Sequence, residues 1–401
     1  MPPELAEHGS RLVDDLTAHA VAVEPGQQGY TGTFIDSSTF DAEDYRQTWL
    51  VNKVLVEGQP AVVGGSKKTL KTSICIDMAI SLAAGMREQF LGRFRVENPR
   101  RVGVISGESG EATIRETARR ICKSKGLELS RLNVYWSFML PQVSREEQLD
   151  KLAEAITANG LEVVILDPLY LSLLAGNATA SAANMFDMGP LLSNLSTACL
   201  NAGATPILVH HTKKLGKGDR FRLPELEDLA FAGVQEFARQ WILLGRREAY
   251  EPGSGEHKLW LGVGGSAGHS GSWAVDVNEG ELNQNFSGRQ WGVDVRTAGE
   301  EFSRADAERQ DNKAEKDQTK RDSAILRMRA ALESYPEGET YSVIRETAGL
   351  NGAQARPALV ELENTGVVEK TTITKRAGNG TRESDAYRLA RTASEDEEDA
   401  A

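Results

Sequence analysis

Short apolar runs alternate with helical patterns through the middle of the chain, from Trp49 to about Val277. Runs rich in valine, isoleucine and leucine predict buried strands at 60–64, 101–106, 161–166 and 205–210. Apolar residues at helical spacing predict helices at 71–84, 111–125 and 188–202. Strands that alternate with helices indicate βαβ units, and therefore an α/β fold with a mainly parallel sheet. Because the runs are continuously apolar, both faces of the sheet should be covered.

Two later apolar runs, 241–245 and 258–263, are expected to extend this sheet as an antiparallel edge. The segment from Phe237 to Arg246 is predicted to end a helix and enter the first of these strands. The glycine-rich stretch Leu261–His269 is interpreted as a flexible loop, because a lone glycine cluster is a weak sign of a dinucleotide site.

The pattern changes near residue 299, where residues 299–322 become charged and predict a linker or an exposed helix. Helices are expected at 324–332, at 341–347 after the N-cap Thr340, and from the cap Asn351 to about Asn364. Two strands around the loop 375–382 follow, and three helices before a hairpin is the order of a winged helix-turn-helix. The predicted organisation is an N-terminal extension (1–44), an α/β core (45–298), a charged linker (299–322), a winged-helix-like domain (323–392) and an acidic disordered tail (393–401).

Composition narrows the class of protein. The 401 residues are 40% hydrophobic and 26% charged, which is typical of a globular chain of two or three domains. No apolar run reaches the ~20 residues of a membrane span, and the first residues are polar and acidic, so neither a membrane partner nor secretion is expected. The three cysteines lack metal-ligand spacing and favour a reduced, cytoplasmic protein. The net charge of −12 argues against coating nucleic acid by bulk charge but permits a local basic surface.

A polar turn joins the first predicted strand to the first helix. Its residues are Gly64, Gly65, Ser66, Lys67, Lys68, Thr69, Leu70, Lys71, Thr72 and Ser73. Phosphate binding needs converging backbone N–H groups, a helix N-terminus, a lysine and a hydroxyl for Mg²⁺. All four are present, with Lys71 as the lysine and Thr72 as the hydroxyl, although Leu70 replaces the usual glycine. The alternative is a polar turn with two solvated lysines.

Polar side chains end the next three predicted strands, at the edge where ligands gather in open α/β sheets. Glu108 follows the second strand and can orient a water molecule that attacks phosphate. Asp167 ends an apolar strand in the Walker B pattern, in which the carboxylate holds Mg²⁺ through water. His210 and His211 end the fourth strand. The alternatives are a helix cap for Glu108, a turn for Asp167 and a buried, satisfied side chain for either histidine.

The phosphate loop, read from Gly65 to Thr72, resembles the G-x-x-K-x-x-K-T form of the RepA-like (AAA_25) branch of RecA-type P-loop ATPases. In that branch a lysine often replaces a loop glycine, and Lys68 matches it. The resemblance covers about residues 45–265. It rests on the order of phosphate loop, glutamate, Walker B aspartate, histidine and arginine.

This resemblance implies a RecA-like fold that binds ATP and Mg²⁺ and hydrolyses ATP at the subunit interfaces of a ring-shaped homo-oligomer, a hexamer being one form. It gives Lys71 the stabilisation of transferred charge, Thr72 and Asp167 the metal, and Glu108 the water. The glutamate is followed in the family by an arginine-rich helix, which carries Arg115, Arg119 and Arg120 here.

The resemblance also implies a histidine that senses the γ-phosphate and an arginine that reaches the neighbouring subunit. His211 is preferred to His210 for the first role, and Arg239 is preferred to Arg246 for the second. Without a ring, the arginine is a surface residue.

Two loops are expected to face nucleic acid in such a ring. One spans 171–190 with Asn177 and Asn184, and the other carries the basic residues Lys213, Lys214, Lys217, Arg220 and Arg222. The C-terminal module offers further candidates on its third helix and its hairpin loop, namely Gln354, Arg356, Lys375, Arg376 and Arg382. Solvated loops and a protein-binding module are the alternatives, because Glu361 and Glu363 repel phosphate.

The sequence therefore predicts an ATP-hydrolysing motor or switch that acts on DNA, similar to RepA-type replicative helicases. One alternative is an ATP-dependent DNA-binding regulator without strand separation. Another is a nucleotide binder that does not turn over, because of Leu70.

Overall fold

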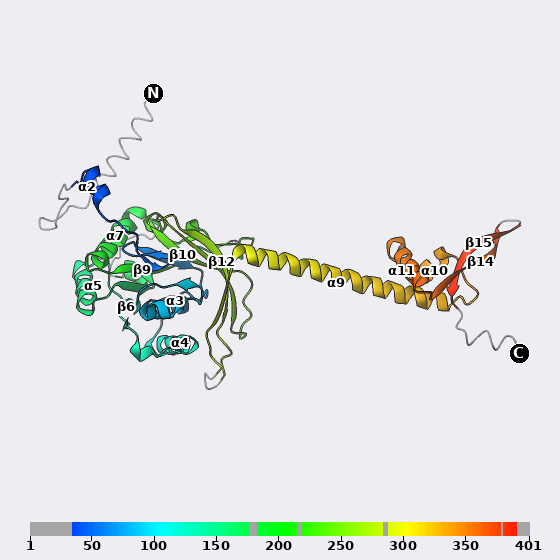
Figure 1. Cartoon of the computed structure of the whole chain (residues 1–401), viewed down its shortest axis with the longest axis horizontal. Coiled ribbons are helices and arrows are strands. Elements are labelled where there is room, and N and C mark those ends of the chain that lie inside the picture. The colour runs from blue at the N-terminus through cyan, green and yellow to red at the C-terminus, as the bar shows by residue number, and fades with distance from the viewer. Residues whose placement is uncertain are drawn as a thin grey trace, which may run out of the picture. The chain divides into compact units, whose positions relative to one another are not determined.

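The computed structural model describes residues 34–175, 183–214, 216, 218–283, 288–377 and 380–390. The chain divides into two compact units between Ala298 and Gly299 (Figure 1). Within the described ranges, no helix has both the length and the apolar character needed to cross a membrane.

A nine-stranded sheet, counted over the described residues, forms the centre of the first unit, in the order β13-β12-β11-β10-β3-β9-β8-β6-β7. Neighbouring strands from β10 to β7 are parallel: β3 Ala61–Gly65, β6 Val102–Ser106, β7 Val134–Ser137, β8 Val163–Asp167, β9 Thr205–His211 and β10 Gln240–Arg246. The remaining strands are antiparallel: β11 Glu256–Gly265, β12 Ser270–Asn278 and β13 Gly292–Thr297. The mainly parallel sheet predicted from the apolar runs is confirmed.

Helices cover both faces of this sheet (Figure 1). One face packs against α3 Lys71–Ala84 and α4 Glu111–Ser124. The other packs against α5 Glu146–Asn159, α6 Leu169–Leu174, α7 Met185–Asn201 and α8 Val234–Phe237. In β3, Val63 joins the first core and Val62 the second, because successive side chains of a strand point to opposite faces. Eleven of the 14 residues of α3 are buried.

Short elements complete the first unit. They are α2 Ser37–Ala42, the pair β1 Trp49–Val51 and β2 Leu55–Val56, the pair β4 Gln89–Phe90 and β5 Phe94–Arg95, and single 3-10 turns at Gly85–Arg87, Leu129–Arg131 and Leu226–Asp228.

The later strands correct the expected antiparallel edge. β10 is an interior strand that pairs parallel with β3, and only β11 pairs with it antiparallel. The connection from β9 to β10 is long and includes α8, which permits a parallel crossover. The sheet then continues through β12 and β13, which periodicity did not predict, as it also missed β7 and α5.

The glycine-rich stretch 261–269 is likewise not a flexible loop, because its first five residues lie in β11. A Cβ on Gly264 would meet Cζ2 of Trp241 at 2.4 Å. The glycine therefore makes room for the neighbouring indole on the sheet.

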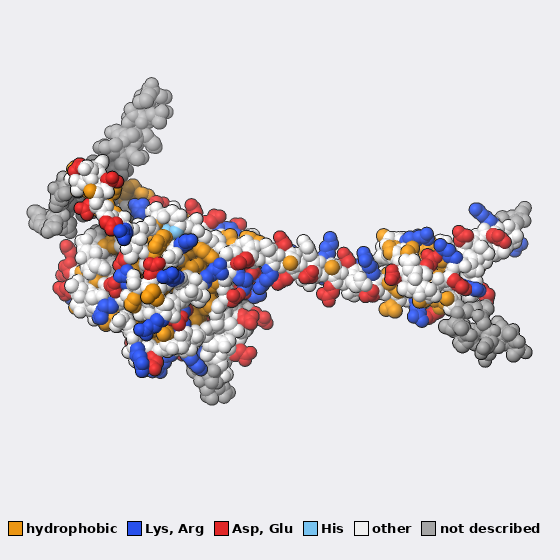
Figure 2. Space-filling view, viewed as in Figure 1, with side chains coloured by type: hydrophobic (Ala, Val, Ile, Leu, Met, Phe, Trp, Pro, Cys, Tyr) orange, Lys and Arg blue, Asp and Glu red, His pale blue; other side chains and the backbone are white. Residues whose placement is uncertain are grey.

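The second unit contains α9 Ala298–Glu333, α10 Tyr341–Thr347, α11 Gly352–Asn364 and a hairpin of β14 Val368–Ala377 and β15 Gly380–Leu389. Met328, Leu332, Ile344 and Leu359 are buried in its core. The charged segment 299–322 is an exposed helix continuous with the next one, and Figure 2 shows acidic and basic side chains interspersed along α9. The predicted order of helices and hairpin is present, and the winged-helix interpretation stays a prediction.

Candidate functional site

The carboxyl ends of β3, β6, β8 and β9 border one cavity of about 700 Å³. Its lining is Lys67, Lys68, Thr69, Leu70, Lys71, Thr72, Ser73, Glu108, Asp167, Tyr170, His210, His211, Ala230 and Phe231. Residues predicted from four separate motifs thus come together at the edge where parallel α/β sheets bind ligands.

The loop after β3 contains two residues with positive φ. Lys68 and Leu70 are left-handed, with φ of 63° and 60°, and Leu70 is the N-cap of α3. A non-glycine residue in this region costs about 1–2 kcal/mol, so the loop must be held by other contacts. One comes from Thr69, whose hydroxyl donates to the Ser66 carbonyl at 2.8 Å.

Gly64 and Gly65 have no space for a side chain. A Cβ on Gly64 would lie 2.4 Å from Cδ2 of Leu229, and one on Gly65 would lie 2.7 Å from the Thr69 hydroxyl. Both glycines therefore serve close packing at the base of the loop.

Lys71 is the buried cation of the site, with 9% of its surface exposed. Its Nζ donates to the carbonyls of Gly65 at 2.9 Å and Ser66 at 3.0 Å, which folds the side chain back along the loop. Burial lowers the pKa of Lys71, while the carboxylates of Asp167 and Glu108 act in the opposite direction. The ammonium is thus placed beside the helix N-terminus, where an anion would bind.

Thr72 and Asp167 form an oxygen pair next to this lysine. The Thr72 hydroxyl donates to Oδ2 of Asp167 at 2.5 Å. Burial raises the pKa of Asp167, and the bond from Thr72 and the charge of Lys71 oppose that rise. No group of three or more metal-binding His, Cys, Asp or Glu side chains occurs in the described ranges. The pair fits Mg²⁺, which keeps several waters and takes few protein ligands beside phosphate oxygens.

Glu108 is exposed at the mouth of the cavity, two residues after β6. Its Oε1 accepts a hydrogen bond from the Tyr170 hydroxyl at 2.5 Å. This contact raises the pKa of Tyr170 to about 12. Sequence reasoning missed Tyr170, whose one available signal was an aromatic residue three positions after Asp167 in the Walker B pattern.

The two histidines differ in environment. His210 is 1% exposed, its Nε2 lies 3.1 Å from the Ala230 carbonyl, and its ring contacts that of Phe231 at 4.8 Å. His211 is half-buried, and its ring centroid lies 5.5 Å from that of Tyr170. His211 is therefore the histidine closer to the Tyr170–Glu108 pair, and His210 packs into the wall.

Burial lowers the pKa of His210 to about 4, from an ordinary 6.5. Between pH 6.5 and 4 the unfolded chain binds a proton that the folded chain excludes, so stability is lost as the pH falls through this window. We expect the free energy of unfolding to fall by about 3 kcal/mol across this window. The His210→Asn substitution should remove most of this pH dependence. Urea unfolding at pH 7 and 4.5, followed by tryptophan fluorescence, measures this because all six tryptophans precede residue 299. Equal pH dependence in both proteins would contradict it.

The two candidate arginines lie at opposite ends of β10. Arg239 is exposed and precedes β10, whose first residue Gln240 pairs with Ala61 at the start of β3. Arg246 ends β10, and its Nη2 donates to the Lys68 carbonyl at 2.6 Å. Within one chain, the preferred arginine is thus away from the cavity and the alternative one borders the phosphate loop.

Some of the basic residues after His211 already have partners within the fold. Arg222 pairs with Asp228 at 2.6 Å, and Lys213 donates to the Glu227 carbonyl at 3.1 Å. Arg222 is therefore paired within the fold, and its assignment as a nucleic-acid contact stays a prediction. Lys214 and Arg220 are exposed, and Lys217 lies outside the described residues.

The stretch 171–190 is not one loop, because it begins within α6 and ends within α7. Asn184 caps α7 by accepting from the Phe186 N–H, and Asn177 lies outside the described residues. Among the arginines of α4, Arg115 and Arg119 are exposed, but Arg120 is buried and paired with Glu279.

Contacts within the second unit occupy several of its candidate residues. Gln354 belongs to the capping box with Asn351, and the Arg356 guanidinium lies 5.4 Å from the centre of the Tyr341 ring. Lys375 forms an ion pair with Glu339. Arg376 and Arg382 on the hairpin are exposed.

Comparison with known proteins supports the resemblance. Residues 31–217 match the family model AAA_25, described as an AAA domain. No curated protein matches the chain. The match includes the phosphate loop, Glu108, Asp167 and His211, and it ends before Arg239. It indicates a P-loop ATPase-like domain, and the expected AAA_25 resemblance is confirmed for this part of the chain.

Proposed function

From the AAA_25 domain that residues 31–217 match, we propose that this protein hydrolyses ATP in the cavity at the carboxyl edge of its sheet. One observation carries the proposal: a lysine held against the phosphate loop, a hydroxyl–carboxylate pair and an exposed glutamate line the same cavity. Phosphoryl transfer depends mainly on positioning and charge stabilisation, and these groups supply both.

Six residues of the cavity have roles in this proposal. The Lys71 ammonium stabilises the negative charge that develops on the transferred phosphoryl group. Thr72 and Asp167 would hold Mg²⁺, which when bound neutralises phosphate charge. Glu108 orients the attacking water, and the Tyr170 hydroxyl holds its carboxylate at the mouth of the cavity. His211 lies beside this pair and senses the γ-phosphate.

The partner that we propose is DNA. Support comes from Lys214 and Arg220, which are exposed on the segment after His211, and from the exposed Arg376 and Arg382 of the hairpin. The segment is coupled to the site through the backbone, because Thr212 N–H donates to the carbonyl of Gly65, at the base of the phosphate loop, at 3.2 Å. In a motor or switch similar to RepA-type replicative helicases, this connection would link the bound nucleotide to the DNA contact.

We further assign Arg239 to the cavity of a neighbouring subunit in a homo-oligomer. It is exposed just before β10, at the end of the strand away from its own phosphate loop, so it does not line the cavity of its own chain. In that position its guanidinium adds positive charge to the transition state.

An ATP-dependent DNA-binding regulator without strand separation is the second candidate function. The second unit favours it, because its helices and a hairpin with the exposed Arg376 and Arg382 could contact duplex DNA without strand separation by the core. The net charge of −12 permits it, because a regulator needs only a local basic surface.

ATP turnover with added single-stranded DNA, duplex DNA or RNA, together with strand displacement, distinguishes these functions. A motor is expected to hydrolyse ATP several-fold faster with its nucleic acid and to separate strands. A regulator hydrolyses ATP without separating strands. Nucleotide binding without any turnover would contradict the ATPase proposal and identify a binder that Leu70 has inactivated.

A further inference from the structure

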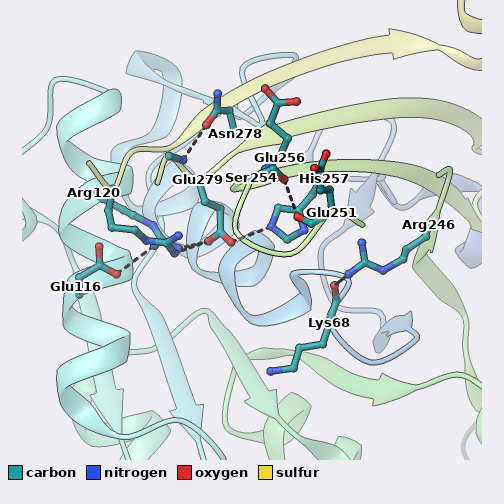
Figure 3. Close-up of polar contacts among 12 residues, drawn as sticks. Lys68, Glu116, Arg120, Arg246, Glu251, Ser254, Glu256, His257, Asn278 and Glu279 are labelled. Atoms are coloured by element: carbon teal, nitrogen blue, oxygen red, sulfur yellow. Dashed lines mark hydrogen bonds and ion pairs between the residues drawn. The ribbon is translucent and has the colours of Figure 1, made fainter. Parts of the chain in front are cut away.

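Arg246 is a half-buried cation that the ATPase proposal does not use within its own chain. β10 and β3 run parallel, and Leu244 pairs with Gly65, the last residue of β3. Two residues further on, Arg246 extends past the end of β3 and reaches the phosphate loop from the neighbouring strand. Figure 3 shows its guanidinium directed at the backbone of Lys68, to whose carbonyl it donates at 2.6 Å.

We propose that Arg246 is a positioning residue of the phosphate loop, which holds the Lys68 peptide in the orientation that nucleotide binding requires. The inference rests on the proposed function and assigns to the arginine a role in its own subunit. It concerns the geometry of the loop and gives Arg246 no direct part in the chemistry.

The loop needs such support because of its sequence. Lys68 and Leu70 occupy left-handed conformations that glycine adopts without strain. Strained residues persist only where the surrounding structure determines their conformation. The bonds made by Thr69 and Lys71 end on Gly65 and Ser66, at the start of the loop. Arg246 supplies the side-chain bond to Lys68 itself, at the first strained residue.

Arg246 is in turn fixed by a chain of contacts. Its guanidinium lies 5.0 Å from the centre of the Tyr250 ring, which stacks on His257 at 4.6 Å with 13° between the planes. His257 Nε2 lies 3.1 Å from Oε2 of Glu279. Figure 3 shows this glutamate between His257 and Arg120 of α4. The arginine is therefore connected to a buried ionic cluster, and its position is determined from outside the loop.

A second feature of the guanidinium agrees with this role. Over the part of the chain that the structure describes, the buried Nη1 atom has no hydrogen-bond partner. Burial lowers the pKa of Arg246, although an arginine stays charged at neutral pH. Leaving the enclosed Nη1 atom without a partner is unfavourable by itself, so the favourable contribution of the guanidinium to the loop is its bond to the Lys68 carbonyl.

Two measurements test the inference: hydrogen exchange over residues 68–75 without nucleotide, and the affinity of a fluorescent ATP analogue. The exchange window includes the Ile74 N–H, which donates to the Leu70 carbonyl at 2.9 Å. The Arg246→Ala protein is expected to exchange its amide hydrogens faster over this window and to bind the ATP analogue about tenfold more weakly. A tenfold loss of affinity corresponds to the loss of one hydrogen bond from a charged group. Arg246→Lys, which keeps a charged donor, should recover part of both.

The decisive variant relieves the strain directly. Glycine at position 68 adopts positive φ freely, so adding Lys68→Gly to Arg246→Ala should shrink the effect of Arg246→Ala to less than about twofold. Arg100→Ala is the matched control, because Arg100 is also a half-buried arginine, paired with Glu57 and Glu162. It should leave exchange over 68–75 unchanged.

The outcomes separate the inference from the proposed function. Unchanged exchange over 68–75 in Arg246→Ala overturns the inference, whatever the affinity. An equal loss of affinity with and without Lys68→Gly also overturns it, because strain is then not the cause. If the wild-type protein binds no nucleotide but Arg246→Ala still loosens the loop, the ATPase proposal fails and the positioning role stands.

Discussion

Lys71→Ala is expected to reduce ATP hydrolysis by about 10²–10³-fold or more, which is the loss seen when one preorganised donor to a transition-state anion is removed. The lysine is 9% exposed and is held by the carbonyls of Gly65 and Ser66, so its ammonium is in place before nucleotide binds. A bound triphosphate would lose this charge at the helix N-terminus. Steady-state turnover at saturating ATP measures the effect.

Folding should survive this substitution, because it removes a buried charge and leaves a good helix former at the start of α3. Lys123→Ala is the matched control, since Lys123 is an exposed lysine near the end of α4. It should retain wild-type turnover. Wild-type turnover in a folded Lys71→Ala protein would refute the assignment of the phosphate loop.

Glu108→Gln should produce the second large effect, a loss of about 10²–10⁴ in turnover, which is typical of removing a general base. Nucleotide affinity should stay near the wild-type value. The glutamine keeps a carbonyl oxygen that can accept the Tyr170 hydroxyl bond, now 2.5 Å long, so the side chain can stay in place while its charge is lost. Single-turnover hydrolysis together with a binding titration separates the two quantities.

Glu111→Gln provides the comparison for this variant. Glu111 is exposed at the start of α4, three residues along the chain, and does not line the nucleotide cavity. It should hydrolyse ATP as the wild type does. If Glu111→Gln lost as much turnover as Glu108→Gln, general charge near the cavity would explain both results, and the water-orienting role would be rejected.

Much of the fold was predictable because buried parallel strands are uniformly apolar. Helix α3 occurs at 71–84 as predicted, and the runs at 101–106 and 205–210 lie within one residue of β6 and β9. β10 was misassigned, since the apolar run 241–245 does not reveal the direction of the neighbouring strand. That direction follows from the long crossover that precedes the strand.

The candidate site was likewise predictable only in part. Lys71, Thr72 and Asp167 were identifiable because each follows or ends a recognisable strand, and the cavity brings them together. Tyr170 and the contact of Arg246 with Lys68 were not, because both depend on tertiary neighbours distant in sequence. The ion-pair partners of Arg222 and Lys375 could not be predicted either, since a basic residue gives the same sequence signal whether it is solvated or paired.

The burial of α3 bears on which side chains of the cavity can be displaced. Eleven of its 14 residues are enclosed by the core, so we expect this helix to belong to the part of the protein that opens last. Glu108 and His211 line the same cavity, and their side chains are exposed and half-buried, respectively. If the cavity binds nucleotide as proposed, Lys71 should therefore stay in place during a catalytic cycle, and adjustment should fall to Glu108 and His211.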